Sequence, residues 1–296
     1  MSAITFVIPA FNAAATLEAT VLSIFDQNFS PGDHVIIVND ASTDRTLPIA
    51  QTLVRRYAPH LALITNETNQ GCPASRNIGI GRATTPLIMN LDADNILLPQ
   101  SITALRTGLV AAEADVAAFA TYKYFIEDPR FITHFWHCRP GMFTLADLLA
   151  GHINPGPGGN FLYTKQSWER IGGYWEYGKG LHEAWGFTLK QLAAGARIAI
   201  VPNTAYLHRH GHASLFATES KKKAEEYTLT RKMIEPYLDR LEPDDRLYIE
   251  QTPAWYELLS KRPLRLRGSA LGHTGHMERT WYGYYLTMRQ FLRLRF

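Results

Sequence analysis

The sequence predicts an α/β fold in which helices cover both faces of a mostly parallel central sheet. Apolar runs of strand length alternate along the chain with segments whose apolar residues recur at helical spacing. The runs are apolar throughout, which is typical of parallel strands buried on both faces. With 296 residues, 46% of them hydrophobic and 19% charged, the chain is long enough for one large domain or two smaller ones.

The N-terminal part of the chain has the most regular pattern. We expect strands at 5–9, 35–38, 61–64 and 87–91, and helices at 13–28, from about 45 to 57, and at 73–82. The first helix is predicted because Leu17, Val21, Leu22 and Phe25 follow helical spacing after Asn12, a suitable N-cap.

The pattern is less regular after residue 100. We expect helices at 101–112, 171–174 and 182–194, and strands at 116–125, 160–163 and 198–201. Residues 127–159 have little pattern, and their glycine- and proline-rich end, 151–159, is either a mobile segment or a plain connection. From about residue 219 the chain becomes charged and helical in character.

Composition limits where the protein works. No run approaches the roughly 20 apolar residues that span a bilayer, and the N-terminus lacks the pattern of a signal peptide. Cys72 and Cys138 provide neither a disulfide framework nor a zinc ligand set. We therefore expect a cytoplasmic protein in a reducing compartment, with no nucleic acid as partner, because no binding module is present.

An acidic pair follows the strand expected at 87–91. Asp92 and Asp94 lie where the strand ends, and ligands bind at the carboxyl edge of a parallel sheet. Two carboxylates there suit a divalent cation that also contacts the phosphates of a substrate. An isolated pair of this kind also occurs in ordinary turns, so its meaning depends on the neighbouring motifs.

Several motifs in order resemble those of the family 2 glycosyltransferases, which are inverting enzymes with the GT-A fold. The matching stretches are Val7-Ile8-Pro9-Ala10-Phe11-Asn12, Val38-Asn39-Asp40-Ala41-Ser42-Thr43-Asp44, 69–77, Leu91-Asp92-Ala93-Asp94, Asn160, 171–174 and Glu183-Ala184-Trp185. The resemblance covers about residues 3–215. It implies a glycosyltransferase domain at 1–215, with a nucleotide-binding half at 1–98 and an acceptor-binding half at 99–215. Residues 216–296 would form a helical, basic extension.

The resemblance implies a nucleotide diphosphate sugar, a UDP-sugar, as donor and Mn²⁺ or Mg²⁺ as cofactor. A divalent metal stabilises the charge that develops on the leaving diphosphate. Asp94 is expected to bind the metal directly, while Asp92 holds the donor's ribose or reaches the metal through water. Ala93 belongs to the same donor contact.

Further donor contacts are expected on the first two strands and the third helix. Asp40 would accept a hydrogen bond from the base, unless it only forms a turn. Pro9 and Phe11 would form the wall of the base slot, unless Phe11 is a core residue. Arg76 would pair with the diphosphate, unless it lies on a solvated helix face. The expected nucleotide-sugar contacts are thus Pro9, Ala10, Phe11, Asn12, Asp40, Arg76, Asp92 and Ala93.

The catalytic base is where the sequence departs from the family. The family places an aspartate where this chain has Ala184, and that aspartate takes the acceptor proton. Glu183 has shifted into the role, or His182 serves, or the protein is impaired. We predict Glu183, although a carboxylate at a helix start is also favoured by the helix dipole alone.

Histidines and aromatic residues complete the expected site. His208, His210 and His212 lie where relatives carry a metal-binding histidine, and His210 fits best by spacing. Asn160, Trp175 and Trp185 are expected to contact the acceptor, a saccharide or a lipid-linked saccharide, with the other aromatic residues buried.

The C-terminal tail has a charge of its own. Residues 261–296 carry eight Lys or Arg and one acidic residue, a net charge of +7; since the whole chain carries +3, the first 260 residues carry −4. Aromatic residues, leucines and arginines mixed in this way are typical of a segment on an anionic membrane surface. A peripheral contact with the cytoplasmic face of the inner membrane, or with a partner protein, is expected; packing on the catalytic domain is the alternative.

The sequence therefore predicts a metal-dependent inverting glycosyltransferase of bacterial surface polysaccharide or glycan synthesis. Two other classes stay open. A non-catalytic nucleotide-sugar-binding subunit is compatible with Ala184, and a nucleotidyltransferase would also use acidic residues to hold metal.

Overall fold

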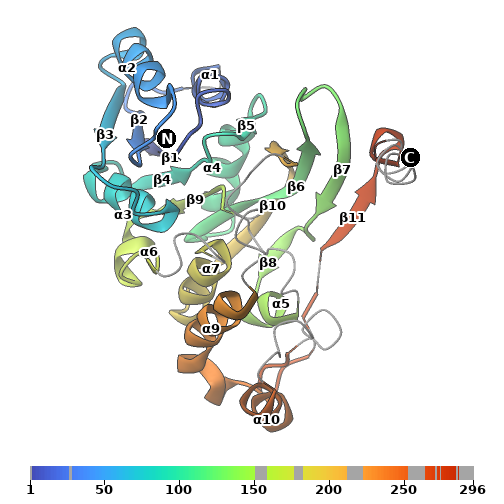
Figure 1. Cartoon of the computed structure of the whole chain (residues 1–296). Coiled ribbons are helices and arrows are strands. Elements are labelled where there is room, and N and C mark those ends of the chain that lie inside the picture. Colours follow the sequence, from blue (N-terminus) through green and yellow to red (C-terminus); the bar gives the residue numbers. More distant parts are fainter. Residues whose placement is uncertain are drawn as a thin grey trace, which may run out of the picture.

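The computed structural model describes residues 2–26, 29–150, 159–176, 183–211, 223–252, 264–270, 272–273, 275–284 and 286. A central twisted sheet with helices packed against it runs through the molecule, and further helices gather at one end (Figure 1). This is the α/β architecture that the sequence predicts.

The parallel part of the sheet is built as expected. Strands pair in the order β3-β2-β1-β4, all parallel, with helices in the connections between them. The strands are β1 (Ile4–Ala10), β2 (His34–Asn39), β3 (Leu61–Thr65) and β4 (Leu87–Asn90), and the helices are α1 (Leu17–Phe25), α2 (Thr46–Tyr57) and α3 (Cys72–Arg82). The carboxyl ends of β1, β2 and β4 therefore meet at one edge.

Helix α3 lies unusually close to β1 and β2. Gly79 allows this, because a Cβ atom added there would lie 2.5 Å from a side-chain carbon of Val7 and 3.1 Å from one of Val38. The close approach holds the N-terminal turn of α3, including Arg76, against the carboxyl edge of the sheet.

The second part of the sheet is mixed. Strand β9 runs antiparallel between β4 and β6, and β6 pairs with β10 in parallel and with β7 in antiparallel. Short strands β5 and β8 pair with β10, and β11 extends the far edge beside β7 (Figure 1). These strands are β5 (Ile96–Leu97), β6 (Val116–Phe125), β7 (Ile132–His137), β8 (Gly141–Phe143), β9 (Phe161–Thr164), β10 (Ile198–Arg209) and β11 (His276–Arg279).

Helices cover this second part too. Helix α4 (Ser101–Ala111) packs on β6 and β10, and α5 (Leu145–Ala150), α6 (Lys165–Arg170) and α7 (Glu183–Ala193) follow. Helices α9 (Lys223–Ile234) and α10 (Pro243–Gln251), joined by the 3₁₀ helix η2 (Glu235–Arg240), lie beyond α7. With Leu264 they form a second apolar core around Leu149, Leu189, Met233 and Ile249.

The structure corrects three expectations from the sequence. Residues 171–174 are not helical, because Gly172 and Gly173 take positive φ angles of 66° and 73° after α6 has ended. Strand β10 does not stop at Val201 but continues to Arg209, with an irregularity between Val201 and Ala205 that accommodates Pro202. The tail is not wholly helical, because β11 is a strand.

No helix within the described ranges is long and apolar enough to cross a membrane. The glycine-rich stretch expected to be a mobile segment or a plain connection falls outside the described residues, except for Gly159.

A buried ion pair joins the start of the sheet to α4. The carboxylate of Asp33 is fully buried. It pairs with Nη2 of Arg106 at 2.5 Å and accepts a hydrogen bond from the backbone N–H of Ile4 at 2.8 Å. We expect Asp33→Ala to lower the free energy of unfolding by about 3–5 kcal/mol, because the Arg106 charge would remain buried without its partner. Urea unfolding measures this.

The matched control for this prediction is Asp128→Ala. Asp128 also pairs with an arginine, Arg130, but that arginine is 82% exposed, so water replaces the lost contact. Equal losses in the two variants would contradict the structural role assigned to Asp33.

Candidate active site

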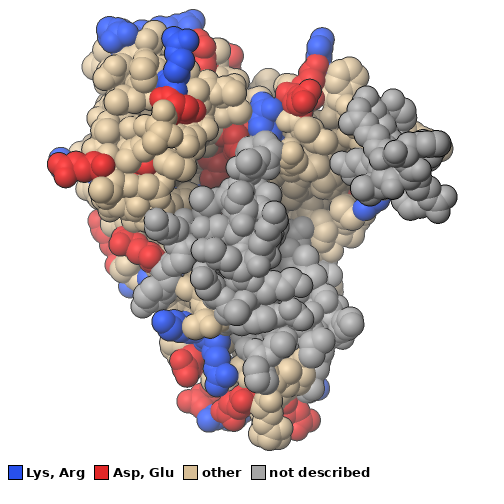
Figure 2. Space-filling model, in the orientation of Figure 1, with Lys and Arg blue, Asp and Glu red and all other residues tan. Residues whose placement is uncertain are grey.

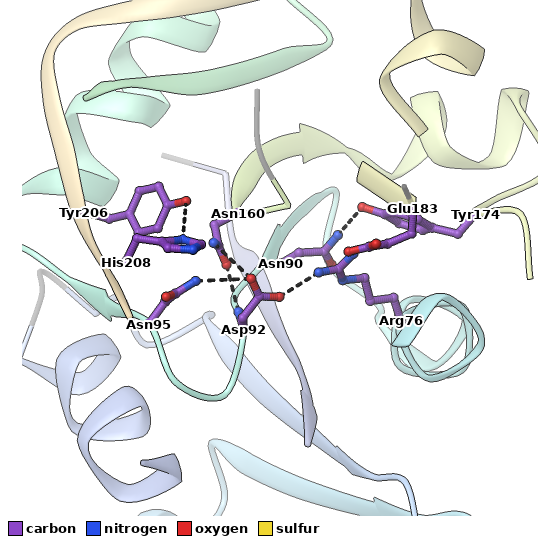
Figure 3. Close-up of polar contacts among 9 residues, drawn as sticks. All are labelled: Arg76, Asn90, Asp92, Asn95, Asn160, Tyr174, Glu183, Tyr206 and His208. Atoms are coloured by element: carbon purple, nitrogen blue, oxygen red, sulfur yellow. Dashed lines mark hydrogen bonds and ion pairs between the residues drawn. The ribbon is translucent and has the colours of Figure 1, made fainter. Parts of the chain in front are cut away.

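A buried arginine is the centre of the candidate site. Arg76, from the first turns of α3, donates from Nη2 to Oδ1 of Asp92 at 2.6 Å and from Nη1 to Oε1 of Glu183 at 3.1 Å (Figure 3). Its side chain is 1% exposed, so the solvated helix face considered for it is excluded. It brings together the loop after β4 and the start of α7, which are far apart in sequence.

Aromatic and amide groups surround this guanidinium. It lies over the ring of Tyr174, with Cζ 5.3 Å from the ring centre, and the hydroxyl of Tyr174 accepts a hydrogen bond from Asn90. Gly159 approaches so closely that a Cβ atom there would lie 2.9 Å from Nη2. Arg76 is therefore fixed in position on several sides.

Asp92 is held by hydrogen bonds and an ion pair on several sides. Besides Arg76 at Oδ1, its Oδ2 accepts from Asn95 at 3.1 Å and from Asn160 at 3.2 Å. The backbone N–H of Asp92 donates to Oδ1 of Asn160 at 2.7 Å. Both carboxylate oxygens are thus engaged, an arrangement that suits an indirect role toward a metal better than direct ligation.

Burial dominates the electrostatics of Glu183. Its pKa is raised above the ordinary value of 4.5 because removal from water penalises the charged form. Arg76 opposes this shift and Asp92 adds to it. A carboxylate with a raised pKa exchanges protons closer to neutral pH than an ordinary glutamate does.

The predicted histidine ligand lies elsewhere than expected. His210 is engaged on β7, with Nε2 2.8 Å from the hydroxyl of Thr133. His208, two residues earlier on β10, instead points toward Asp92 and Asn160 and is held by the hydroxyl of Tyr206 (Figure 3).

Within the described ranges, no group of three or more His, Cys, Asp or Glu residues could hold a metal by itself. Asp94 lies half-buried in the turn between β4 and β5. His212 and His182, which the sequence also raised, fall outside the described residues.

Asp40 connects the end of β2 to the entry of α3. Its Oδ1 accepts from the side chain of Asn66 at 2.7 Å and the backbone of Gln70 at 3.0 Å, and its Oδ2 accepts from the backbone of Gly71 at 2.8 Å. All three donors come from more than 25 residues downstream, so Asp40 is not a local turn former. It fixes the loop that leads to Arg76.

The turn after β1 is partly exposed. Phe11 is 43% exposed, which excludes the core role considered for it, whereas Ala10 is fully buried. Asn12 accepts a hydrogen bond from the backbone of Thr43 at 2.8 Å, and Pro9 is partly buried. Ala93 is buried beside Asp92.

The two tryptophans expected near the acceptor differ in environment. Trp185 is 8% exposed and belongs to the second apolar core. Trp175 is partly exposed, with Nζ of Lys190 5.3 Å from the centre of its ring. Trp175 is thus the better placed of the two to meet a ligand.

Sequence reasoning missed the amide residues that organise the site. Asn90 donates a hydrogen bond to the hydroxyl of Tyr174, and Asn95 donates one to Asp92. Asn77 accepts a hydrogen bond from the backbone N–H of Tyr174 and so holds the turn at 173–174. Asn77 could have been found from the sequence, because it directly follows Arg76 in the motif at 69–77. Asn90 and Asn95 frame the acidic pair, and a polar residue inside an apolar strand end is the signal that identifies them.

Solved structures of other proteins share this arrangement of helices and strands. Staphylococcus aureus TarS 1-349 in complex with UDP-GlcNAc has a TM-score of 0.67 at 18% identity, covering 87% of this chain and 73% of that one. Mannosyltransferase PcManGT from Pyrobaculum calidifontis, in complex with GDP-Man and Mn²⁺, has a TM-score of 0.60 at 15% identity, covering 87% and 72%. At these identities the likeness shows the fold, which is the GT-A fold.

The chain belongs to glycosyl transferase family 2, whose sequence profile matches residues 5–172. The match includes Asp40, Arg76 and Asp92 but stops before Glu183. The protein is thus a glycosyltransferase by family, as the motifs predicted.

Curated relatives match over a shorter stretch. The uncharacterized glycosyltransferase YibD of Escherichia coli K12 is 32% identical over 114 residues, which are 38% of this chain and 32% of the relative. The teichoic acid poly(glycerol phosphate) polymerase of Staphylococcus epidermidis is 31% identical over 103 residues, 35% of this chain and 14% of that protein. The matched parts therefore span a third or less of these relatives.

Removing Arg76 is expected to be costly in a pH-dependent way. Arg76→Met leaves Glu183, which is 20% exposed, without its counter-charge and is expected to lower the free energy of unfolding by up to about 3 kcal/mol near neutral pH. Arg76 favours the charged form of Glu183, so its contribution falls as pH drops and the carboxyl becomes protonated. The loss should therefore be smaller near pH 4.5, the ordinary glutamate value.

Denaturant unfolding at the two pH values measures this effect, with Arg130→Met, at an exposed ion pair, as control. A loss of stability that is the same at both pH values would show that the charge of Glu183 does not contribute to the effect of Arg76.

Proposed function

We propose that the protein is a metal-dependent inverting glycosyltransferase that transfers a sugar from a UDP-sugar to a hydroxyl of a saccharide or lipid-linked acceptor. The observation that carries this proposal is the contact of Arg76 with both Asp92 and Glu183. One buried cation thereby joins the residue expected to hold the donor to the residue expected to activate the acceptor. A role in bacterial surface polysaccharide or glycan synthesis is supported by the teichoic acid polymerase among the relatives.

The donor class is supported by the neighbouring structures. TarS was solved with UDP-GlcNAc and PcManGT with GDP-Man, so the fold accepts nucleotide diphosphate sugars with different bases. In this chain the turn after β1, with Phe11 exposed at its tip, would receive the base. Asp40 would act on the base only by a contact beyond the three hydrogen bonds that it already makes.

The residues present fit a metal that takes most of its ligands from the substrate. Mg²⁺ and Mn²⁺ sites of this kind need one or two carboxylates, with water and phosphate oxygens filling the other positions. Asp94 would be the direct ligand, with His208 beside Asp92 as the second group. When bound, the metal stabilises charge on the leaving diphosphate.

Glu183 would take the proton of the acceptor hydroxyl. The acceptor oxygen then attacks the anomeric carbon while the nucleotide diphosphate departs from the opposite face, which inverts the configuration. The raised pKa of Glu183 suits a base that works near neutral pH. The contact with Arg76 keeps the carboxylate of Glu183 oriented. Glu183 would thereby take the role of the aspartate that this chain lacks at position 184, where it has Ala184.

Binding of nucleotides tests the donor and metal sites. We expect one of UDP, GDP and dTDP to bind the wild type in calorimetric titration, and to bind at least about tenfold more weakly without Mn²⁺. Asp94→Ala should remove the metal-dependent part, whereas Asp115→Ala, which removes a carboxylate paired with Arg170, should not. Binding of no nucleotide by the folded protein would remove the transferase proposal.

Glu183→Gln tests the base. Turnover, followed as nucleotide release from the donor that binds, should fall by about 10²–10⁴-fold while donor affinity is kept. In the wild type the acid limb of the pH–rate profile should lie above 4.5, because the pKa of Glu183 is raised, and the variant should lose this limb. Glu169→Gln, at a largely exposed glutamate on α6, is the control.

Unchanged turnover in Glu183→Gln would contradict the assignment of Glu183 as the catalytic base. Donor binding without turnover in the wild type, with every acceptor offered, would favour the non-catalytic subunit. Release of pyrophosphate from a nucleoside triphosphate would instead identify a nucleotidyltransferase.

A further inference from the structure

Exposed apolar side chains gather at the far edge of the sheet. The aromatic patch, as we name it, consists of exposed large hydrophobic residues: Phe131, Met277, Trp281, Tyr282 and Tyr284. Trp281 is 91% exposed. The patch lies around β7, β11 and the following helical turn, at the side of the molecule remote from β1–β3 (Figure 1).

The patch is a built surface, because hydrogen bonds fix its helical turn to β7. Thr280 donates its backbone N–H to the carbonyl of Thr133, and its hydroxyl contacts the carbonyls of Ile132 and Thr133. Gly283 is so close to the strand that a Cβ atom would lie 2.1 Å from the carbonyl oxygen of Thr133. Rotation of the helical turn that buried its aromatic rings would break these contacts.

The rings themselves are paired. Phe131 and Tyr282 lie 5.4 Å apart between ring centres, and Trp281 and Tyr284 lie 6.5 Å apart. The hydroxyl and indole groups of Tyr and Trp allow such rings to lie where apolar matter meets water. An exposed cluster of this kind indicates an interaction surface.

The charge of the adjoining sequence indicates what kind of surface it meets. From Glu278, which is 67% exposed on β11, to the C-terminus the chain has four arginines and one acidic residue, a net charge of +3. Arg279 is exposed on β11 beside the patch. A second copy of the chain would bring like charges together, whereas anionic lipid offers opposite charge over a wide plane.

Figure 2 supports the separation of this surface from the acidic region. Acidic side chains are set in a recess in the middle of the face shown, between the lobe at the upper left and the arm at the right. The patch belongs to the arm. Contact at the patch would not use the acidic side chains of the recess.

We propose that the aromatic patch seats the protein on the surface of an anionic membrane. The rings of Trp281, Tyr282 and Tyr284 enter the interface between headgroups and acyl chains, and Arg279 pairs with anionic headgroups. The contact is peripheral and needs no membrane-spanning helix. It does not depend on the glycosyl transfer proposed above.

Co-sedimentation of the full chain with lipid vesicles tests this proposal. The wild type should bind vesicles of phosphatidylcholine with an equal part of phosphatidylglycerol at least about tenfold better than phosphatidylcholine alone, and less at high salt. Trp281→Ala/Tyr284→Ala should lower binding by about tenfold or more. Val110→Ala/Leu247→Ala, which removes two exposed apolar side chains elsewhere, should bind as the wild type does.

A second pair of variants separates charge from apolar contact. Arg279→Gln should weaken binding to anionic vesicles, whereas Arg55→Gln, an exposed arginine on α2, should not. The proposal is overturned if the wild type stays in the supernatant with anionic vesicles. It is also overturned if the Trp281/Tyr284 variant binds fully, or if that variant loses a dimer seen by sedimentation while vesicle binding is unaffected.

Discussion

The site depends on one buried guanidinium. Arg76 is removed from water, and its charge is stabilised because Asp92 and Glu183 reach it from two different segments. The two carboxylates, 31% and 20% exposed, compensate the charge of an arginine that is itself 1% exposed. The loop after β4 and the start of α7 are therefore placed by a mutual electrostatic requirement, to which the ring of Tyr174 and the close approach of Gly159 add shape.

The parallel part of the fold and its acidic edge could be predicted from the sequence. Strands β1–β4 are continuous apolar runs, and Asp40 and Asp92 each follow such a run, so their place at the sheet edge follows from chain direction alone. The contact of Arg76 with Glu183 could not be predicted in this way. It joins residues 107 positions apart, and periodicity carries no information on which long-range partners a buried charge will find.

The errors have physical causes of the same kind. The strand expected at 198–201 is too short, because the neighbouring strand β6 continues and β10 pairs with it again from Ala205 after an irregularity. His208 contacts the hydroxyl of Tyr206 and His210 that of Thr133, and the choice between them as a metal ligand stays a prediction. Residues 276–279 were expected to belong to a helical tail, but they form β11, which pairs with the edge of β7. A strand of this kind depends on a partner that is distant in sequence.

Strand β9 has a mechanical consequence. It pairs with β4 on one side and β6 on the other, and Asn160, directly before it, bonds to Asp92. The strands on the two sides of β9 thus share one uninterrupted sheet, and any swivel between them would break backbone hydrogen bonds. The distance between Asp92 and Asn160 is consequently a property of strand separation.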